Sequence, residues 1–277
     1  MVLSAGTCTS AKNRQSPLWT ACANRGSTNE GLANRSEQRE DAPRHIAIME
    51  GTYKMPYQYR IICLANSRKL SGRCVAGKVT TGDYTGYWLR PIGTTATHEI
   101  TERDREYQDG TTAQKLDVID ITFTGTAPAG FQQENHIIDD TIYWEKAGQM
   151  VVNDLAAIVD APATLWENGN HSYSGVNDRV SVEHLTQPRQ SLYLIQPQNV
   201  TFKVSAEGAQ FGNPKRVVRA KFTYNRIQYA LTVTDPETEQ HYKAQPNGEY
   251  AANVSYFTIS LGEPYNGDAY KLVAAVF

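Results

Sequence analysis

The C-terminal part of the chain consists of short apolar runs, each followed by a turn signal. Runs that are rich in β-branched and aromatic residues and bounded by Gly, Pro, Asn or Asp are typical of strands. So many short strands in so few residues favour a small β-barrel. The turn signals are Asn213-Pro214, Asp235-Pro236, Asn247-Gly248 and Asn266-Gly267. The expected strands are residues 192–195, 200–204, 216–224, 228–234, 256–261 and 270–277.

A second group of strands is expected upstream, over residues 59–65, 72–78 and 86–92. Pro91 ends the regular pairing of the third strand, because proline has no amide hydrogen to donate. Three short strands at this spacing favour another small barrel or a sandwich. Residues 116–123 alternate between apolar and polar, as in a half-buried strand.

The segment between the two groups of strands has a different pattern. Over residues 133–166 the hydrophobic period lengthens, which suits helices around short turns. The charged residues 101–107 are expected to form a short helix. The sequence therefore predicts a mainly β protein, with two small barrels joined by a mixed α and irregular segment.

The N-terminal segment differs from the rest of the chain. Ser, Thr, Asn, Arg and Gly dominate residues 1–48, and neither a helical nor an alternating period is present. This segment has six basic and four acidic residues, so its net charge is +2. Because the whole chain has a net charge of −2, the remainder carries −4. We interpret residues 1–56 as a disordered leader, or as sequence upstream of the true start at Met49 or Met55. The alternative is a basic tail that steers the protein toward phosphate.

Three parts are thus expected, and their composition restricts their location and partners. They are the leader at residues 1–56, a first barrel with the helical segment at 57–185, and a second barrel at 186–277. No apolar run reaches the about 20 residues of a membrane span, so no membrane partner is expected. The four cysteines, Cys8, Cys22, Cys63 and Cys74, form no CxxC pair. Free thiols favour a cytoplasmic protein without a zinc ribbon or a disulfide framework.

Segments that resemble a known family occur in order along most of the chain. The opening segments are Ile62-Cys63-Leu64-Ala65-Asn66-Ser67-Arg68-Lys69, Gly72-Arg73-Cys74-Val75-Ala76-Gly77 and Trp88-Leu89-Arg90-Pro91. The later ones are Tyr107-Gln108-Asp109-Gly110, Leu116-Asp117-Val118, Gln133-Glu134-Asn135-His136, Leu165-Trp166, Gly175-Val176-Asn177-Asp178-Arg179, Leu231-Thr232-Val233-Thr234-Asp235-Pro236, Ser260-Leu261-Gly262-Glu263-Pro264 and Tyr270-Lys271-Leu272. Together they resemble the bacterial dual OB-containing domain over roughly residues 57–277. The resemblance implies two OB-like barrels with a nucleic-acid role, in bacterial defence or mobile-element settings.

The first candidate binding site is the polar stretch Asn66-Ser67-Arg68-Lys69, expected as a loop, with Arg73 and Lys78 after it. Cations beside small hydrogen-bonding side chains suit contacts to phosphate or sugar. Trp88 and Arg90 are expected on the same face, and stacking with phosphate binding requires such a mixture of rings and cations. The alternative is a β-turn in which Asn and Ser bond the backbone while Arg and Lys are solvated.

A second basic cluster contains Arg219 and Lys221, preceded by Lys215 and Arg216. Alternation places Arg219 and Lys221 on one strand face together with Tyr229, and Phe222 and Tyr224 on the other. The alternative to nucleic-acid binding is a solvated outer face over an aromatic core. Two polar clusters, residues 133–136 and 175–179, are interpreted as helix caps, with ligand binding between the barrels as the alternative.

Enzyme motifs are incomplete. The segment His98-Glu99-Ile100-Thr101-Glu102 has Glu where a zinc-protease helix needs its second His, and the six histidines are scattered. No catalytic residue, metal ligand or cofactor is therefore expected. The leading hypothesis is a non-enzymatic protein that binds single-stranded DNA or RNA. The alternatives are a protein-interaction adaptor, or an enzyme on nucleic acid that uses Asp178, Arg179 or the hairpin at Glu263 between the barrels.

Overall fold

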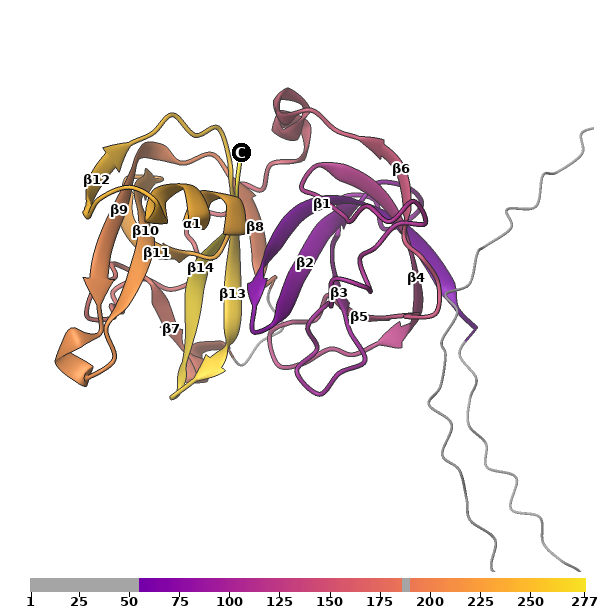
Figure 1. Ribbon diagram of the computed structural model, residues 1–277, viewed down its shortest axis with the longest axis horizontal. Coiled ribbons are helices and arrows are strands. Elements are labelled where there is room, and N and C mark those ends of the chain that lie inside the picture. Colours follow the sequence, from indigo (N-terminus) through magenta and orange to yellow (C-terminus); the bar gives the residue numbers. More distant parts are fainter. Residues whose placement is uncertain (1–54, 186–189) are drawn as a thin grey trace, which may run out of the picture.

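The computed structural model describes residues 55–185 and 190–277. Within these ranges the protein is mainly β, as predicted, and forms two β units that lie side by side (Figure 1). The expected leader falls almost entirely outside the described residues. No helix in the described ranges is long and apolar enough to cross a membrane.

The first unit is a closed barrel of five strands. The strands follow the order β1-β2-β3-β5-β4, and a further pairing between β1 and β4 closes the ring, while β6 adds to β4 outside it. The strands are β1 (Tyr57–Lys69), β2 (Gly72–Val79), β3 (Trp88–Ile92), β4 (Asp117–Thr126), β5 (Asn135–Ile138) and β6 (Glu145–Gln149). Alternate residues such as Ile61, Cys63 and Ile121 point into the barrel and form its apolar core.

The second unit is a sheet of eight strands around a single aromatic core. Its order is β12-β9-β10-β11-β14-β13-β8, with β7 paired to β14. The strands are β7 (Arg179–Ser181), β8 (Leu192–Ile195), β9 (Gln198–Glu207), β10 (Lys215–Tyr224), β11 (Ile227–Val233), β12 (Gly248–Ala251), β13 (Phe257–Tyr265) and β14 (Asp268–Val276). Phe222 stacks on Tyr229 at 5.4 Å between ring centres, and Phe257 packs edge to face against Phe222.

The segments between the strands differ from the expected helices. Residues 133–166 form β5, β6 and the 3-10 helix η1 (Val152–Ile158), because their apolar side chains pack against strands of both units. Residues 101–107 form turns and isolated bridges. The α-helix of the described ranges is α1 (Pro236–Lys243), at a position expected to be a turn. The remaining 3-10 helices are η2 (Val182–Leu185) and η3 (Ala209–Phe211).

The stretch from Asn66 to Lys69, expected as a loop, belongs to β1. Its four residues pair in register with residues 72–75 of β2, so the turn of the hairpin consists of Leu70 and Ser71. Two segments before residue 185, where the domain boundary is expected, contact the second sheet. Leu165 and Trp166 lie in the core of the second sheet, and β7 pairs with β14 of that sheet.

The two units share an apolar contact, called the joint below. The outer face of β1 and β2 packs against β8, β14 and the residues before β13, with β1 and β2 beside β13 in Figure 1. Across the joint, the Thr258 hydroxyl donates a 2.6 Å hydrogen bond to the carbonyl oxygen of Leu64. The buried members of the joint are Ile62, Leu64, Ala65, Ala76, Trp88, Leu155, Leu192, Leu194, Tyr256 and Ala274.

Asp160, just after η1, connects both units at the joint. Its carboxylate accepts hydrogen bonds from the Lys78 ammonium at 2.7 Å and the Trp88 indole at 2.9 Å, both in the first barrel. It also accepts one from the backbone amide of Leu194 in the second sheet, at 2.8 Å. The side chain of Lys78 is only 6 % exposed, so its charge depends on this single carboxylate for compensation.

Replacing Asp160 tests how far the joint contributes to stability. Asp160→Ala leaves the buried charge of Lys78 with the carbonyl of Ile158 but without a carboxylate, so we expect the free energy of unfolding to fall by about 3–5 kcal/mol. The measurement is equilibrium unfolding in urea. Asp120→Ala is the matched control, because Asp120 pairs with the exposed Arg60, and its loss is expected below about 1 kcal/mol. Equal losses in the two variants would contradict this role of Asp160.

Candidate functional site

The basic residues of the expected nucleic-acid site are all engaged within the protein. Each of these seven cations lies within ion-pair distance of a carboxylate of the same chain. The pairs are Arg68 with Glu239, Lys69 with Glu263, Arg73 with Glu102, Lys78 with Asp160, Arg90 with Glu134, Arg219 with Asp178 and Glu207, and Lys221 with Glu249. A phosphate at any of these positions would therefore replace an existing carboxylate partner.

Several of these residues connect the two units. Arg68 forms a bidentate pair with Glu239 on α1, and Lys69 reaches Glu263 on β13 at 2.7 Å. Asn66 donates to the carbonyl of Ala113, and Ser67 donates to that of Cys74. In these contacts Asn66 and Ser67 bond the backbone, as the turn alternative expects of them, but they do so from a strand.

The structure distributes the expected site residues over different surfaces. Trp88 lines one cavity of the first barrel, Lys69 and Arg90 line a second, and Asn66 and Arg73 line a third. Arg219 and Lys221 lie on β10, which is separated from β14 by β11 in the order of the second sheet. Tyr229 does not share their face, because it pairs with Phe222 and its ring is buried in the core. Phosphate binding by these residues stays a prediction.

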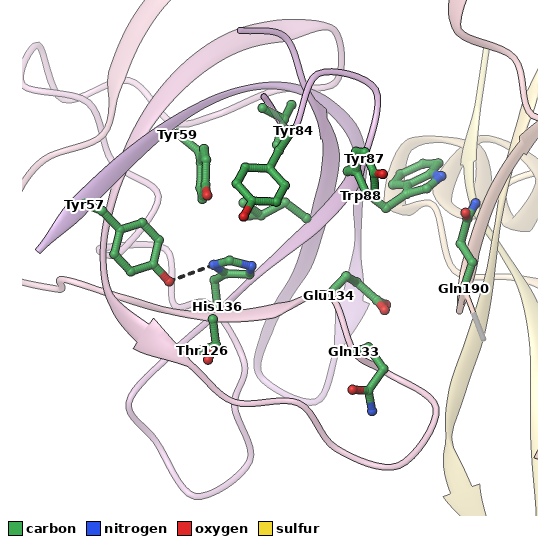
Figure 2. Close-up of a pocket in the computed structure, with 12 residues that line it drawn as sticks. Tyr57, Tyr59, Tyr84, Tyr87, Trp88, Thr126, Gln133, Glu134, His136 and Gln190 are labelled. Atoms are coloured by element: carbon green, nitrogen blue, oxygen red, sulfur yellow. Dashed lines mark hydrogen bonds between the residues drawn. The ribbon is translucent and has the colours of Figure 1, made fainter. Parts of the chain in front are cut away.

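A group of aromatic side chains lines the largest of these cavities, about 580 Å³ in volume (Figure 2). We call this group the aromatic mouth. Tyr57 and Tyr59 point inward from the start of β1, in the same alternation as Ile61 of the core. Val79 and Leu89 belong to the barrel core and also line the cavity, so the mouth opens at one end of the barrel. The aromatic mouth comprises Tyr57, Tyr59, Tyr84, Tyr87, Trp88 and His136.

The tyrosine rings contact one another edge to face. Tyr57 and Tyr59 have ring centres 5.6 Å apart with planes at 74°, Tyr59 and Tyr84 are 5.9 Å apart at 83°, and Tyr84 and Tyr87 are 6.0 Å apart at 82°. Tyr84 and Tyr87 are 55 % and 66 % exposed in the loop between β2 and β3. Large aromatic residues with this much exposure next to a cavity are typical of a binding surface.

Tyr57 is held in place at the inner end of the row. Its hydroxyl and Nδ1 of His136 share a 2.8 Å hydrogen bond, drawn in Figure 2, and its ring stacks on Phe123. Burial, with a smaller effect of Tyr59, raises the pKa of Tyr57 to about 12. Tyr57 is therefore a neutral, fixed wall of the mouth at physiological pH.

The opposite side of the mouth is polar. In Figure 2 Thr126, Gln133 and Glu134 lie across the cavity from the tyrosines, and Gln190 lies beyond Trp88. No Lys or Arg is among the described residues that line this cavity. The mouth therefore offers flat apolar surfaces and hydrogen-bonding groups, without a cation for phosphate.

The sequence contains a signal for the mouth that its strand pattern does not reveal. Tyr84 and Tyr87 follow Gly82 closely in a short loop, where exposed rings have no core to fill. Aromatic residues in a glycine-bounded loop are a stronger indication of binding than aromatic residues within a strand. Glu134 and His136, expected to cap a helix, instead line this cavity.

The residues considered for an enzyme are also engaged in structural contacts. The buried Asp178 accepts hydrogen bonds from Ser172 and Arg219, and Arg179 pairs with Asp268. Lys271 is fully buried, which lowers its pKa to about 7, and its ammonium donates to the carbonyl of Glu167. Within residues 55–185 and 190–277 no group of three or more His, Cys, Asp or Glu gathers to hold a metal ion.

The closed barrel, the accompanying sheet and the aromatic mouth define an OB-type β protein with a ligand-sized cavity. Residues 59–276 match the family model described as the dual OB-containing domain, and the chain belongs to this family. Comparison with curated proteins gave no match, and comparison with solved structures gave none.

The raised pKa of Tyr57 determines part of the pH dependence of stability. The pKa is 10.0 for an ordinary tyrosine and about 12 here, so the unfolded chain releases this proton at lower pH than the folded protein. The free energy of unfolding therefore falls as pH rises from about 10 to about 12, and this contribution levels off at higher pH.

Tyr57→Phe should remove this part of the fall, as measured by urea midpoints across the same pH range. Tyr173→Phe is the control, because Tyr173 is 78 % exposed in a loop remote from the mouth. An unchanged pH slope in Tyr57→Phe would show that the folded protein does not keep Tyr57 protonated in this range.

Proposed function

We propose that this protein binds single-stranded DNA or RNA without catalysing a reaction, and that bases stack on the rings of the aromatic mouth. The observation that carries the proposal is the row of four tyrosines along the open end of an OB-type barrel. We also propose that the protein acts in the cytoplasm of a bacterium, in a defence or mobile-element setting. The free thiols of Cys63 and Cys74 support a reducing compartment.

The arrangement of the rings favours a single strand over a duplex. Neighbouring rings stand at 74–83° to one another, so a run of parallel, stacked bases cannot lie along them. A single strand can turn its bases apart, whereas a duplex keeps them stacked. Stacking of a base on an aromatic side chain contributes about 1–3 kcal/mol per base and tolerates any sequence.

In this proposal the basic residues expected from the sequence make a second contribution to binding, through contacts with phosphate. The side chain of Arg68 is 54 % exposed, and Arg73 and Lys69 are partly exposed. Exposed ion pairs are weak, typically below about 1 kcal/mol, so a phosphate can replace a carboxylate there with little loss. Lys78 and Arg90 are more than nine-tenths buried. Replacing their carboxylate partners by a phosphate would leave a displaced carboxylate unpaired inside the joint or the barrel wall.

Removing the exposed rings tests the stacking contribution. Tyr84→Ala with Tyr87→Ala should weaken binding of a short single-stranded oligonucleotide by about 10- to 100-fold, because a stacking surface is lost. Fluorescence anisotropy with a labelled oligonucleotide at low salt measures the affinity. Tyr173→Ala with Phe211→Ala removes an equally exposed aromatic pair on the second sheet and should leave binding unchanged. The proposal fails if the wild-type protein binds no oligonucleotide, or if both double variants bind equally.

The salt dependence tests the basic contribution separately. Arg68→Ala, Lys69→Ala and Arg73→Ala combined should weaken binding and reduce the slope of log K against log salt, because fewer counterions are released. Anisotropy titrations across a range of salt concentrations give the slope, and circular dichroism checks that the variant is folded. A slope equal to that of the wild type would assign the phosphate contacts to other residues.

A further inference from the structure

Among the described residues that line the cavity of the aromatic mouth, Glu134 is the one with a carboxylate. Its Oε1 accepts hydrogen bonds from Arg90 Nη2, at 3.0 Å, and from the Ser191 hydroxyl. No described residue donates a hydrogen bond to its Oε2. Glu134 therefore lines the cavity and has one carboxylate oxygen to which no described residue donates.

Glu134 is fixed in this position. Its side chain is 8 % exposed, and that of its partner Arg90 is 6 % exposed. Its backbone carbonyl also accepts from the amide of Arg90 at 2.8 Å, next to the parallel pairing of β3 with β5. An acceptor held on both sides loses little freedom when a ligand binds, which favours selectivity.

A ligand that meets this oxygen must donate an N–H or O–H, because an ionised carboxylate only accepts. Adenine, cytosine and guanine each carry an exocyclic amino group, as in the pairing of Glu with the N4 amine of cytosine. Thymine and uracil offer a ring N–H that lies between two carbonyl oxygens, and the lone pairs of these oxygens would repel the carboxylate.

We infer that the aromatic mouth takes one base at a time and selects a base with an exocyclic amino group, which Glu134 recognises through Oε2. This inference rests on the proposed function and adds base selectivity to it. A single base is expected because neighbouring rings are nearly perpendicular and one stack cannot continue from ring to ring. The absence of Lys and Arg from the described lining leaves the phosphates outside the cavity.

The test uses oligonucleotides in which all positions except one central base are abasic. We expect cytosine and adenine at that position to bind at least about tenfold more tightly than thymine, since a hydrogen bond to a charged group is lost with thymine. A central 2-pyrimidinone, which is cytosine without its amino group, should bind as weakly as thymine. These ligand changes leave the protein intact, so they do not depend on the folding of a variant.

Two variants locate the selectivity. Glu134→Gln keeps an acceptor for Arg90 and offers an amide N–H₂ to the mouth, so the preference for cytosine over thymine should disappear or reverse. In Tyr84→Ala with Tyr87→Ala, affinity for both bases should fall together. Circular dichroism confirms that both variants are folded.

The outcomes separate the two proposals. If no natural oligonucleotide binds, the proposed function fails. If oligonucleotides bind but cytosine, thymine and 2-pyrimidinone are equivalent, nucleic-acid binding stands and the role of Glu134 is overturned. A preference for cytosine that persists unchanged in a folded Glu134→Gln variant also overturns it, because another group must then recognise the amine.

Discussion

The contact between the two units depends on the half-buried carboxylate of Asp160. It binds Lys78 and Trp88 of the first barrel and the backbone of Leu194 in the second sheet. The bond to Trp88 has a further effect, because the same indole forms part of the wall of the aromatic mouth. One carboxylate therefore contributes both to the joint between the units and to the wall of the candidate site.

Several cations of this protein form ion pairs that connect its two units. Arg68, Lys69 and Lys115 each pair with a carboxylate of the second unit, and Lys78 pairs with Asp160 at the joint. A chain with net charge −2 has few cations to spare for a polyanion after these pairs are formed. The proposed binding of nucleic acid therefore relies chiefly on the aromatic surface of the mouth, with the exposed cations as a smaller contribution.

Most strands were predictable from the sequence because each buries one face, which leaves an alternating pattern. The prediction was wrong for Asn66 to Lys69, which are polar but continue β1 as far as its tight turn with β2. Helices were expected over residues 133–166 because apolar residues there face two different units, which mimics a longer period. The start of α1 carries a helix signal in Asp235-Pro236, where the Asp235 carboxylate caps the first turn.

The candidate site was harder to predict than the fold. Tyr57 and Tyr59 are separated by some twenty-five residues from Tyr84 and Tyr87, and closure of the barrel brings them together. Similarly, the basic residues have the composition of a phosphate site, but their carboxylate partners lie far away in sequence, 171 positions for Arg68 and Glu239. Local patterns carry no information about such partners.

The joint also has a consequence for synthesis of the chain. Strand β1 is made early, yet its outer face is covered by β14, which ends at Val276. While the ribosome is still adding the last strands, Ile62 and Leu64 lack the part of their apolar cover that Tyr256 and Ala274 supply. Domains generally fold as units from the N-terminus during translation, and exposed apolar faces make such intermediates prone to aggregate. A first barrel produced in isolation would therefore leave this apolar face exposed to solvent, and such a surface favours aggregation.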